Sequence, residues 1–215
     1  MPVAVKMISD FICPWCLIGE ARLQGAIETL IDNIDIEVVW LPFELNPAMP
    51  KEGIARKLYR TRKFRSWERS QALDAQTIAV GKADGVVIDY DRIVKTPNSF
   101  AAHRLSWHAA REGRQRAVVE GLFKAYFAEG RDIGDRAILI EIAGEAGLER
   151  ETVRQFLQSE QGAREVRALE DSAYQAGVQG VPHFDIEGTI IRGAQNAEIL
   201  QQVLVAAHER KISGV

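Results

Sequence analysis

The sequence predicts an α/β fold in which strands and helices follow the order β-α-β … β-β-α around a large all-helical insertion. Three observations indicate this fold. A β-α-β pattern opens the chain, a hairpin and a helix close it, and residues 51–170 between them show helical periodicity almost throughout. We therefore expect residues 1–50 and 171–215 to form one domain, with residues 51–170 as an inserted helical domain.

The opening unit consists of two strands and the helix between them. Residues 3–11 are rich in β-branched and apolar types and predict a strand, and residues 34–41 predict a second one. Apolar residues recur at helical spacing from Leu17 to Ile31, and Pro14 suits the first position of this helix. Two strands joined by a helix pair in parallel, with a right-handed crossover.

The insertion is predicted from successive amphipathic segments. The basic segment ARKLYRTRKFRSW, residues 55–67, is expected to form a helix whose charges face solvent. VVIDY, residues 86–90, is the one segment here that suits a strand. Further helices are expected over residues 100–110, 117–130, 135–147 with Asp135 as N-cap, 149–158 and 161–176.

The chain closes with a hairpin and a helix. HFDIEG and TIIRGA place one strand on each side of Gly188, and residues 197–211 have a helical pattern. Pro182 directly precedes the first of these strands, a position where proline is tolerated. A peptide bond before proline in a tight turn is also where a cis bond can occur, so we note Val181–Pro182 as a candidate.

Composition and charge exclude several classes of partner. The net charge of −3 gives no electrostatic basis for binding nucleic acid or an anionic membrane. No apolar run approaches the roughly 18–20 residues of a membrane span, and the first residues do not form a signal peptide. We therefore expect a cytoplasmic protein without nucleic-acid or membrane partners. The sequence leaves its oligomeric state open.

The only two cysteines, Cys13 and Cys16, enclose Pro14 and Trp15 at the predicted start of the first helix. Three residues apart on a helix, both thiols lie on one face and within reach of a disulfide. The helix N-terminus favours a thiolate, so we expect Cys13 to attack and Cys16, one turn further in, to resolve.

A metal site and an inert buried pair are the alternatives for these cysteines. A structural zinc site needs four ligands, and the chain has two cysteines and four histidines without ligand spacing to them. We therefore expect no metal. A structural disulfide is equally unexpected in the reducing cytoplasm.

These motifs together resemble a known family. A Cys-x-x-Cys pair at the helix start of a β-α-β unit, with Val-Pro before two strands and a helix, resembles the thioredoxin fold. The helical insertion resembles the DsbA superfamily of thiol-disulfide oxidoreductases. Its FrnE-like branch is the most similar, along most of the chain, in the segments SDFICPWC, NSFAAHRL, LFKAYFAEGRDIGD and GVQGVPHF…GAQ.

The resemblance implies roles for four residues of the predicted site. Cys13 matches the attacking thiol of the family and Cys16 its resolving thiol. Pro182 matches the cis-proline that packs against the cysteine pair. Val181 matches the residue whose backbone pairs with an extended peptide segment of the substrate.

Further residues are candidates for substrate contact or for tuning the thiols. Pro14 and Trp15 lie between the cysteines, where Trp15 adjusts redox potential or simply caps the site. Asn98 and His103 match polar positions of the insertion that face the site, and the alternative for His103 is packing between layers. Asp10 is a candidate to influence the thiolate or relay a proton, the alternative being a turn or cap residue.

The sequence thus predicts a protein disulfide oxidoreductase that needs no cofactor beyond a redox-active Cys13–Cys16 disulfide. Its expected substrates are disulfides of proteins or peptides and low-molecular-weight thiols, with glutathione as a candidate co-substrate. The alternative is a glutathione-dependent enzyme of the kappa-class transferase or 2-hydroxychromene-2-carboxylate isomerase type. Those enzymes resemble the same superfamily, but they typically carry serine in place of Cys13 and do not use Cys16. A third class is a thiol-based redox sensor or chaperone.

Overall fold

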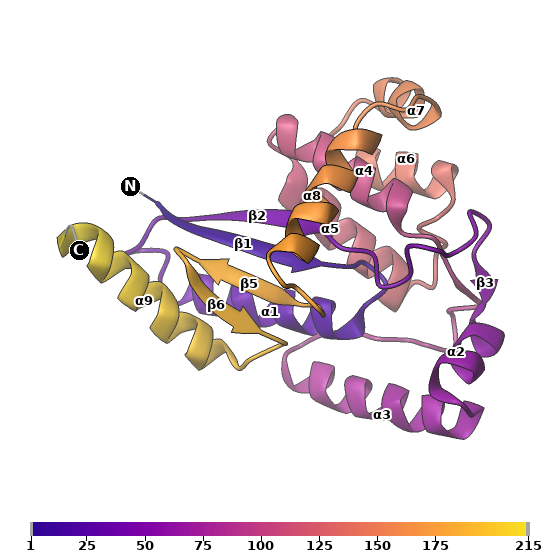
Figure 1. Ribbon diagram of the computed structural model, residues 1–215, viewed down its shortest axis with the longest axis horizontal. Helices are drawn as coiled ribbons and strands as arrows, with labels where there is room; N and C mark the ends of the chain where they lie inside the picture. Colours follow the sequence, from indigo (N-terminus) through magenta and orange to yellow (C-terminus); the bar gives the residue numbers. More distant parts are fainter. Residues whose placement is uncertain (1, 214–215) are drawn as a thin grey trace.

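The sheet is assembled from both ends of the chain. Figure 1 shows the computed structural model, which describes residues 2–213. The strands are arranged in the order β2-β1-β5-β6, with bounds Ile36–Pro42, Val3–Ser9, His183–Ile186 and Thr189–Arg192. β1 and β2 are parallel, while β5 is antiparallel to both β1 and β6. The predicted α/β fold, the parallel pair and the hairpin are confirmed.

Helices from the insertion and from the rest of the chain pack on the sheet, and most helices come from the long segment between β2 and β5 (Figure 1). α1 (Pro14–Glu28) contacts α9 (Ala197–Ser213), which also contacts β1 and β5. Within residues 2–213, no helix is both long enough and apolar enough to cross a membrane. The remaining helices are α2 (Arg56–Phe64), α3 (Trp67–Ala83), α4 (Phe100–Arg111), α5 (Gln115–Phe123) with a π-helical turn (Lys124–Ala128), α6 (Arg136–Glu145), α7 (Arg150–Gln158) and α8 (Ala163–Gln175).

The predicted strand at residues 86–90 is wrong. This segment is irregular, because its backbone amides bond elsewhere: Val86 N donates to Gly81 O, and Asp89 N donates to Phe127 O. The insertion instead contains two very short strands, β3 (Ile54–Ala55) and β4 (Lys95–Thr96), which pair with each other. Pairs of two residues are too short for a periodic pattern to predict.

Side chains at helix starts explain several boundaries. Asp135 accepts a hydrogen bond from Ala137 N and caps α6 as predicted. Ser66 accepts from Arg69 N and starts α3, a helix that the basic segment ahead of it obscured. Such caps satisfy backbone amides that have no partner within the helix.

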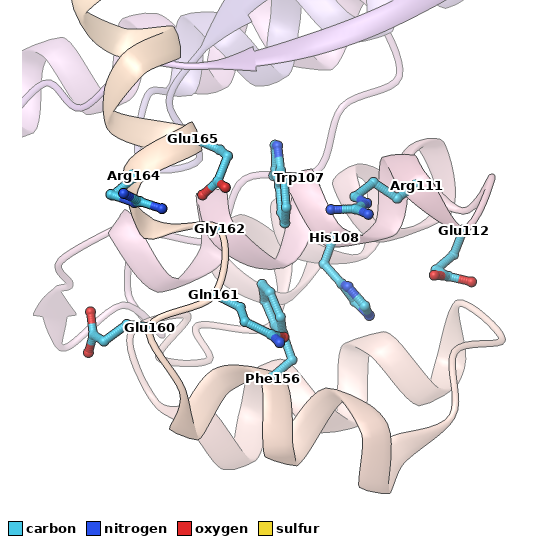
Figure 2. Close-up of a pocket in the computed structure, with 10 residues that line it drawn as sticks. All are labelled: Trp107, His108, Arg111, Glu112, Phe156, Glu160, Gln161, Gly162, Arg164 and Glu165. Atoms are coloured by element: carbon cyan, nitrogen blue, oxygen red, sulfur yellow. The ribbon is translucent and has the colours of Figure 1, made fainter.

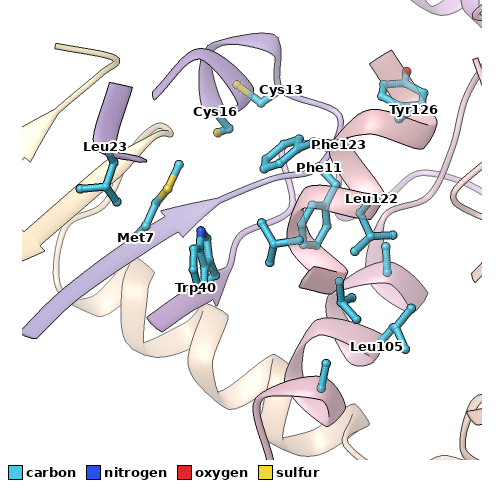
Figure 3. Close-up of a cluster of buried hydrophobic side chains, with 14 of the residues drawn as sticks. Met7, Phe11, Cys13, Cys16, Leu23, Trp40, Leu105, Leu122, Phe123 and Tyr126 are labelled. Carbon is cyan, nitrogen blue, oxygen red and sulfur yellow. The ribbon is translucent and has the colours of Figure 1, made fainter. Parts of the chain in front are cut away.

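The apolar core is continuous from the sheet into the insertion. Buried side chains of β1 and α1 belong to the same cluster as those of α4, α5 and α6. The ring of Phe11, just after β1, lies 5.3 Å from that of Phe123 (Figure 3) and 4.8 Å from that of His103. This packing fixes the end of β1, where the cysteine motif begins, against the insertion. The proposed division into two domains stays a prediction.

Glu20 is a buried carboxyl group in the middle of α1. Trp40 Nε1 and Gln24 Nε2 donate hydrogen bonds to its two oxygens, each at 2.7 Å. Burial outweighs these bonds and raises the pKa of Glu20. The folded protein therefore holds this proton more tightly than the unfolded chain does. Its free energy of unfolding should fall as the pH rises from the ordinary glutamate range through the raised pKa.

We expect Glu20→Gln to flatten this pH dependence, because an amide oxygen can still accept from Trp40 and carries no proton to lose. Denaturant unfolding between about pH 4 and pH 8 would measure it, a range that begins near the ordinary glutamate pKa. Glu28→Gln, at an exposed position of the same helix, should keep the wild-type slope. An unchanged slope in Glu20→Gln would contradict the prediction.

Candidate active site

The first turn of α1 is built around Cys13. Cys13 is the N-cap, with extended backbone angles, and Pro14 occupies the first turn, as predicted. The carbonyl of Cys13 accepts from Cys16 N at 3.0 Å and from Leu17 N at 3.3 Å, and Cys13 N donates to Asp10 O at 3.0 Å. The thiol of Cys13 thus lies at a helix start, where backbone amides without an intrahelical partner are concentrated.

The two thiols have different surroundings (Figure 3). Both are free, Cys13 is 5% exposed and lines a cavity, and Cys16 is fully buried. Burial raises the pKa of the Cys16 thiol well above its ordinary value, and its hydrogen bond with Cys13 raises it further. A substrate entering this cavity would therefore meet Cys13 first, with Cys16 held behind it as a thiol.

The turn before β5 lies against the cysteines. The Val181–Pro182 peptide bond is cis, and Val181 O lies 3.7 Å from the Cys13 Sγ as a hydrogen-bond acceptor. The buried Pro182 accepts from Gly193 N through its carbonyl at 2.9 Å. This turn is brought here by the antiparallel pairing of β1 with β5, in which Ile8 is opposite His183.

Asp10 is fully buried behind the cysteine motif and positions its loop. Its two carboxylate oxygens accept from Ile12 N at 3.3 Å and from Leu45 N at 2.7 Å. His103, also buried, places Nε2 3.5 Å from one of these oxygens, too far for an ordinary hydrogen bond. These contacts favour a role for Asp10 in positioning the loop over a role in proton relay.

Asn98 lies in the irregular segment just before α4. Its amide nitrogen donates to Met49 O at 2.8 Å and its oxygen accepts from Phe100 N at 3.0 Å, so both groups hold backbone. Neither Asn98 nor His103 lines the cavity at Cys13. Among residues 2–213, no three or more histidine, cysteine, aspartate or glutamate side chains are grouped so that they could hold a metal ion.

The cavity beside Cys13 has a volume of about 310 Å³ and lies between the cysteine loop and helices α2 and α3. Three predicted contact residues, Pro14, Trp15 and Val181, line it together with Cys13. Its inner wall is aromatic, with Tyr126 and Phe127 among the lining residues. The site therefore combines one accessible sulfur with an apolar recess large enough for a small ligand.

The comparisons with known proteins agree with this arrangement. The family model described as DSBA-like thioredoxin domain matches residues 4–205. The chain belongs to this family. The probable DsbA oxidoreductase SCO1869 from Streptomyces coelicolor is similar to this DSBA-like chain, with 34% identity and a TM-score of 0.88, covering 96% of this chain and 90% of that one.

Two more distant structures share the fold of this DSBA-like chain. A 2-hydroxychromene-2-carboxylate isomerase is 15% identical, covers 99% of both chains and has a TM-score of 0.77. The cytosolic disulfide reductase DsbM from Pseudomonas aeruginosa, in a structure with GSH, is 19% identical. That match covers 98% of this chain and all of DsbM, with a TM-score of 0.65. At these identities the likeness concerns the fold alone.

The solvent-facing prediction for the basic helix is wrong for two of its arginines. Arg56 is buried and Arg60 half-buried, because both pair with Asp74 of α3, at 2.6 Å and 2.5 Å. Both line the cavity of this DSBA-like chain, together with Tyr59 and Lys63 of the same helix. Residues 56, 59, 60 and 63 are spaced so that they share one face of the helix. This spacing is visible in the sequence and could have indicated that the face lines a cavity.

A second cavity, of about 670 Å³, lies in the insertion of this DSBA-like chain (Figure 2), and neither cysteine lines it. Trp107 and His108 of α4 line it with Phe156 of α7, and the His108 ring stacks on Phe156 at 4.4 Å between centroids. None of the predicted site residues lines this cavity. The larger cavity is thus separate from the thiol site.

Proposed function

We propose that this chain is a thiol-disulfide oxidoreductase in which Cys13 attacks and Cys16 resolves. The observation that carries the proposal is the unequal placement of the two thiols. Cys13 opens onto a cavity at the start of α1, whereas Cys16 is fully buried one turn behind it. A single nucleophile would not require a second thiol in that position.

The exchange balances within the protein. The Cys13 thiolate attacks one sulfur of a substrate disulfide, a Cys13–substrate disulfide forms, and the other half leaves as a thiolate. Cys16 then gives its proton to the thiolate released in the first step and attacks the Cys13 sulfur, which releases the second half as a thiolate. The substrate gains two electrons and the protein ends with a Cys13–Cys16 disulfide. The reverse sequence oxidises a dithiol.

Three finer assignments belong to this proposal. Four sequence segments support the FrnE-like branch of the superfamily. Glutathione is the proposed low-molecular-weight partner. DsbM, which shares the fold, has a solved structure with GSH. We also propose a cytoplasmic location, where such a pair would reduce, isomerise or sense disulfides rather than drive oxidative folding.

The test is a redox titration of the purified protein in glutathione buffers. We expect one two-electron transition between the dithiol and a Cys13–Cys16 disulfide. Alkylation of free thiols and mass spectrometry measure the fraction of each form at every buffer ratio. A potential near −120 mV, like that of DsbA, would indicate an oxidant, and one near −270 mV, like that of thioredoxin, a reductant. If Cys16 stays reduced at every buffer ratio while the protein isomerises a glutathione-dependent substrate, the isomerase alternative replaces this proposal.

A further inference from the structure

The cavity beside Cys13 has a pronounced excess of positive charge. Arg56, Arg60 and Lys63 line it from α2, and no aspartate or glutamate is among the described residues of its wall. Asp74, behind the wall, pairs with both arginines and compensates one of the three positive charges. Two positive charges therefore remain on a site that the proposed mechanism does not require to be charged.

Lys63 is the cation best placed to meet a ligand. Its Nζ donates to the neutral Tyr59 hydroxyl at 2.8 Å, and the side chain is exposed on the cavity side of α2. Arg60, in contrast, already uses its guanidinium on Asp74 and on Ser70 Oγ at 2.8 Å. Lys63 can therefore exchange its neutral partner for an anion without breaking an ion pair.

We propose that this cavity selects low-molecular-weight disulfides that carry carboxylates, with Lys63 as the residue that determines the preference. The inference rests on the proposed function and names its substrate class. The cavity volume of about 310 Å³ suits a small molecule. One sulfur of the disulfide would lie at Cys13, its carbon chain against the aromatic wall, and the carboxylate of the far half at α2.

The reaction needs no further reductant in a single turnover. Protein reduced beforehand supplies two electrons from Cys13 and Cys16, which become a disulfide, while the substrate becomes two thiols. The charge of the substrate can therefore be varied while the sulfur chemistry stays the same.

The experiment compares three small disulfides of similar length: dithiodipropionate with two carboxylates, neutral hydroxyethyl disulfide, and cationic cystamine. Single-turnover rates are measured at low ionic strength by acid quench and mass spectrometry. We expect the wild-type rate to decrease in that order. The ratio of the dianionic to the neutral rate should fall about two- to fivefold in Lys63→Gln, as for the loss of an exposed ion pair. Lys63→Glu should favour cystamine.

Arg62→Gln is the matched control, because Arg62 is exposed on the same helix but does not line the cavity. It removes the same charge and should keep the wild-type ratio. The preference for the dianionic disulfide should also shrink in about 1 M salt, because the Debye length there is only about 3 Å. Equal rates for the three disulfides, or an equal shift in both variants, would overturn this inference and leave the oxidoreductase function standing. No reaction with any of them would overturn this inference, and the titration in glutathione buffers would decide the oxidoreductase function separately.

Discussion

Replacing Cys16 with serine is expected to stop turnover and leave the substrate covalently attached to Cys13. Cys13 keeps its helix start and its cavity in this variant, so the first attack still occurs. The second attack requires a sulfur one turn behind, and Cys16 is the only other thiol in the chain. The mixed disulfide therefore accumulates instead of resolving. Intact-protein mass spectrometry after mixing with a disulfide-containing peptide measures this adduct directly.

Cys13→Ser is the matched control. It leaves only the buried Cys16, whose raised pKa keeps it protonated at neutral pH, so we expect neither adduct nor reduction of insulin disulfides above background. Equal insulin reduction by both variants and the wild type would contradict the assignment. An adduct on Cys16 in the Cys13→Ser protein would reverse the two roles.

The parts of the fold that sequence predicts best are those whose pattern is long and local. α1 follows from an apolar repeat with a proline at its start, and β1 and β2 from apolar segments on either side of it. The segment at residues 86–90 has strand-like composition but finds no strand to pair with, since Phe127 O takes one of its amides. Pairing is a tertiary property, and composition does not contain it.

The same distinction applies to the site. Two cysteines at a helix start could be found by local reasoning, whereas the turn at Val181 was linked to them through family resemblance. The basic wall was missed because the burial of Arg56 depends on Asp74, which lies on the next helix. A charge run on one helix is usually solvated, and only a partner placed by tertiary packing makes it part of a cavity.

At Gly19, α1 approaches the Val181–Pro182 turn closely. A Cβ at Gly19 would lie 2.9 Å from Pro182 Cγ and 3.2 Å from Phe184 Cζ. The proline ring has little freedom to move, since it is buried and its carbonyl accepts from Gly193 N. Gly25, on the same helix, would place a Cβ with nothing within 4 Å. Substituting both glycines therefore distinguishes the effect of the close contact with Pro182 from the effect of helix propensity, which is common to both positions.

We expect opposite signs for the two alanine substitutions. Gly25→Ala should raise the free energy of unfolding by about 0.5–1 kcal/mol, the usual gain of alanine over glycine inside a helix. Gly19→Ala has the same gain, but overpacking costs about 1–3 kcal/mol, so its net effect is a loss. Urea unfolding of the reduced proteins measures both.

Gly19→Ala should also slow the thiol chemistry. In the wild type Val181 O lies 3.7 Å from the Cys13 sulfur, and displacing Pro182 would move this oxygen away. We therefore expect slower disulfide exchange in Gly19→Ala and a wild-type rate in Gly25→Ala. If both variants were stabilised equally, α1 and the Val181–Pro182 turn would not be in contact as described. The glycine at residue 19 would then serve neither packing nor the placement of the reactive thiol.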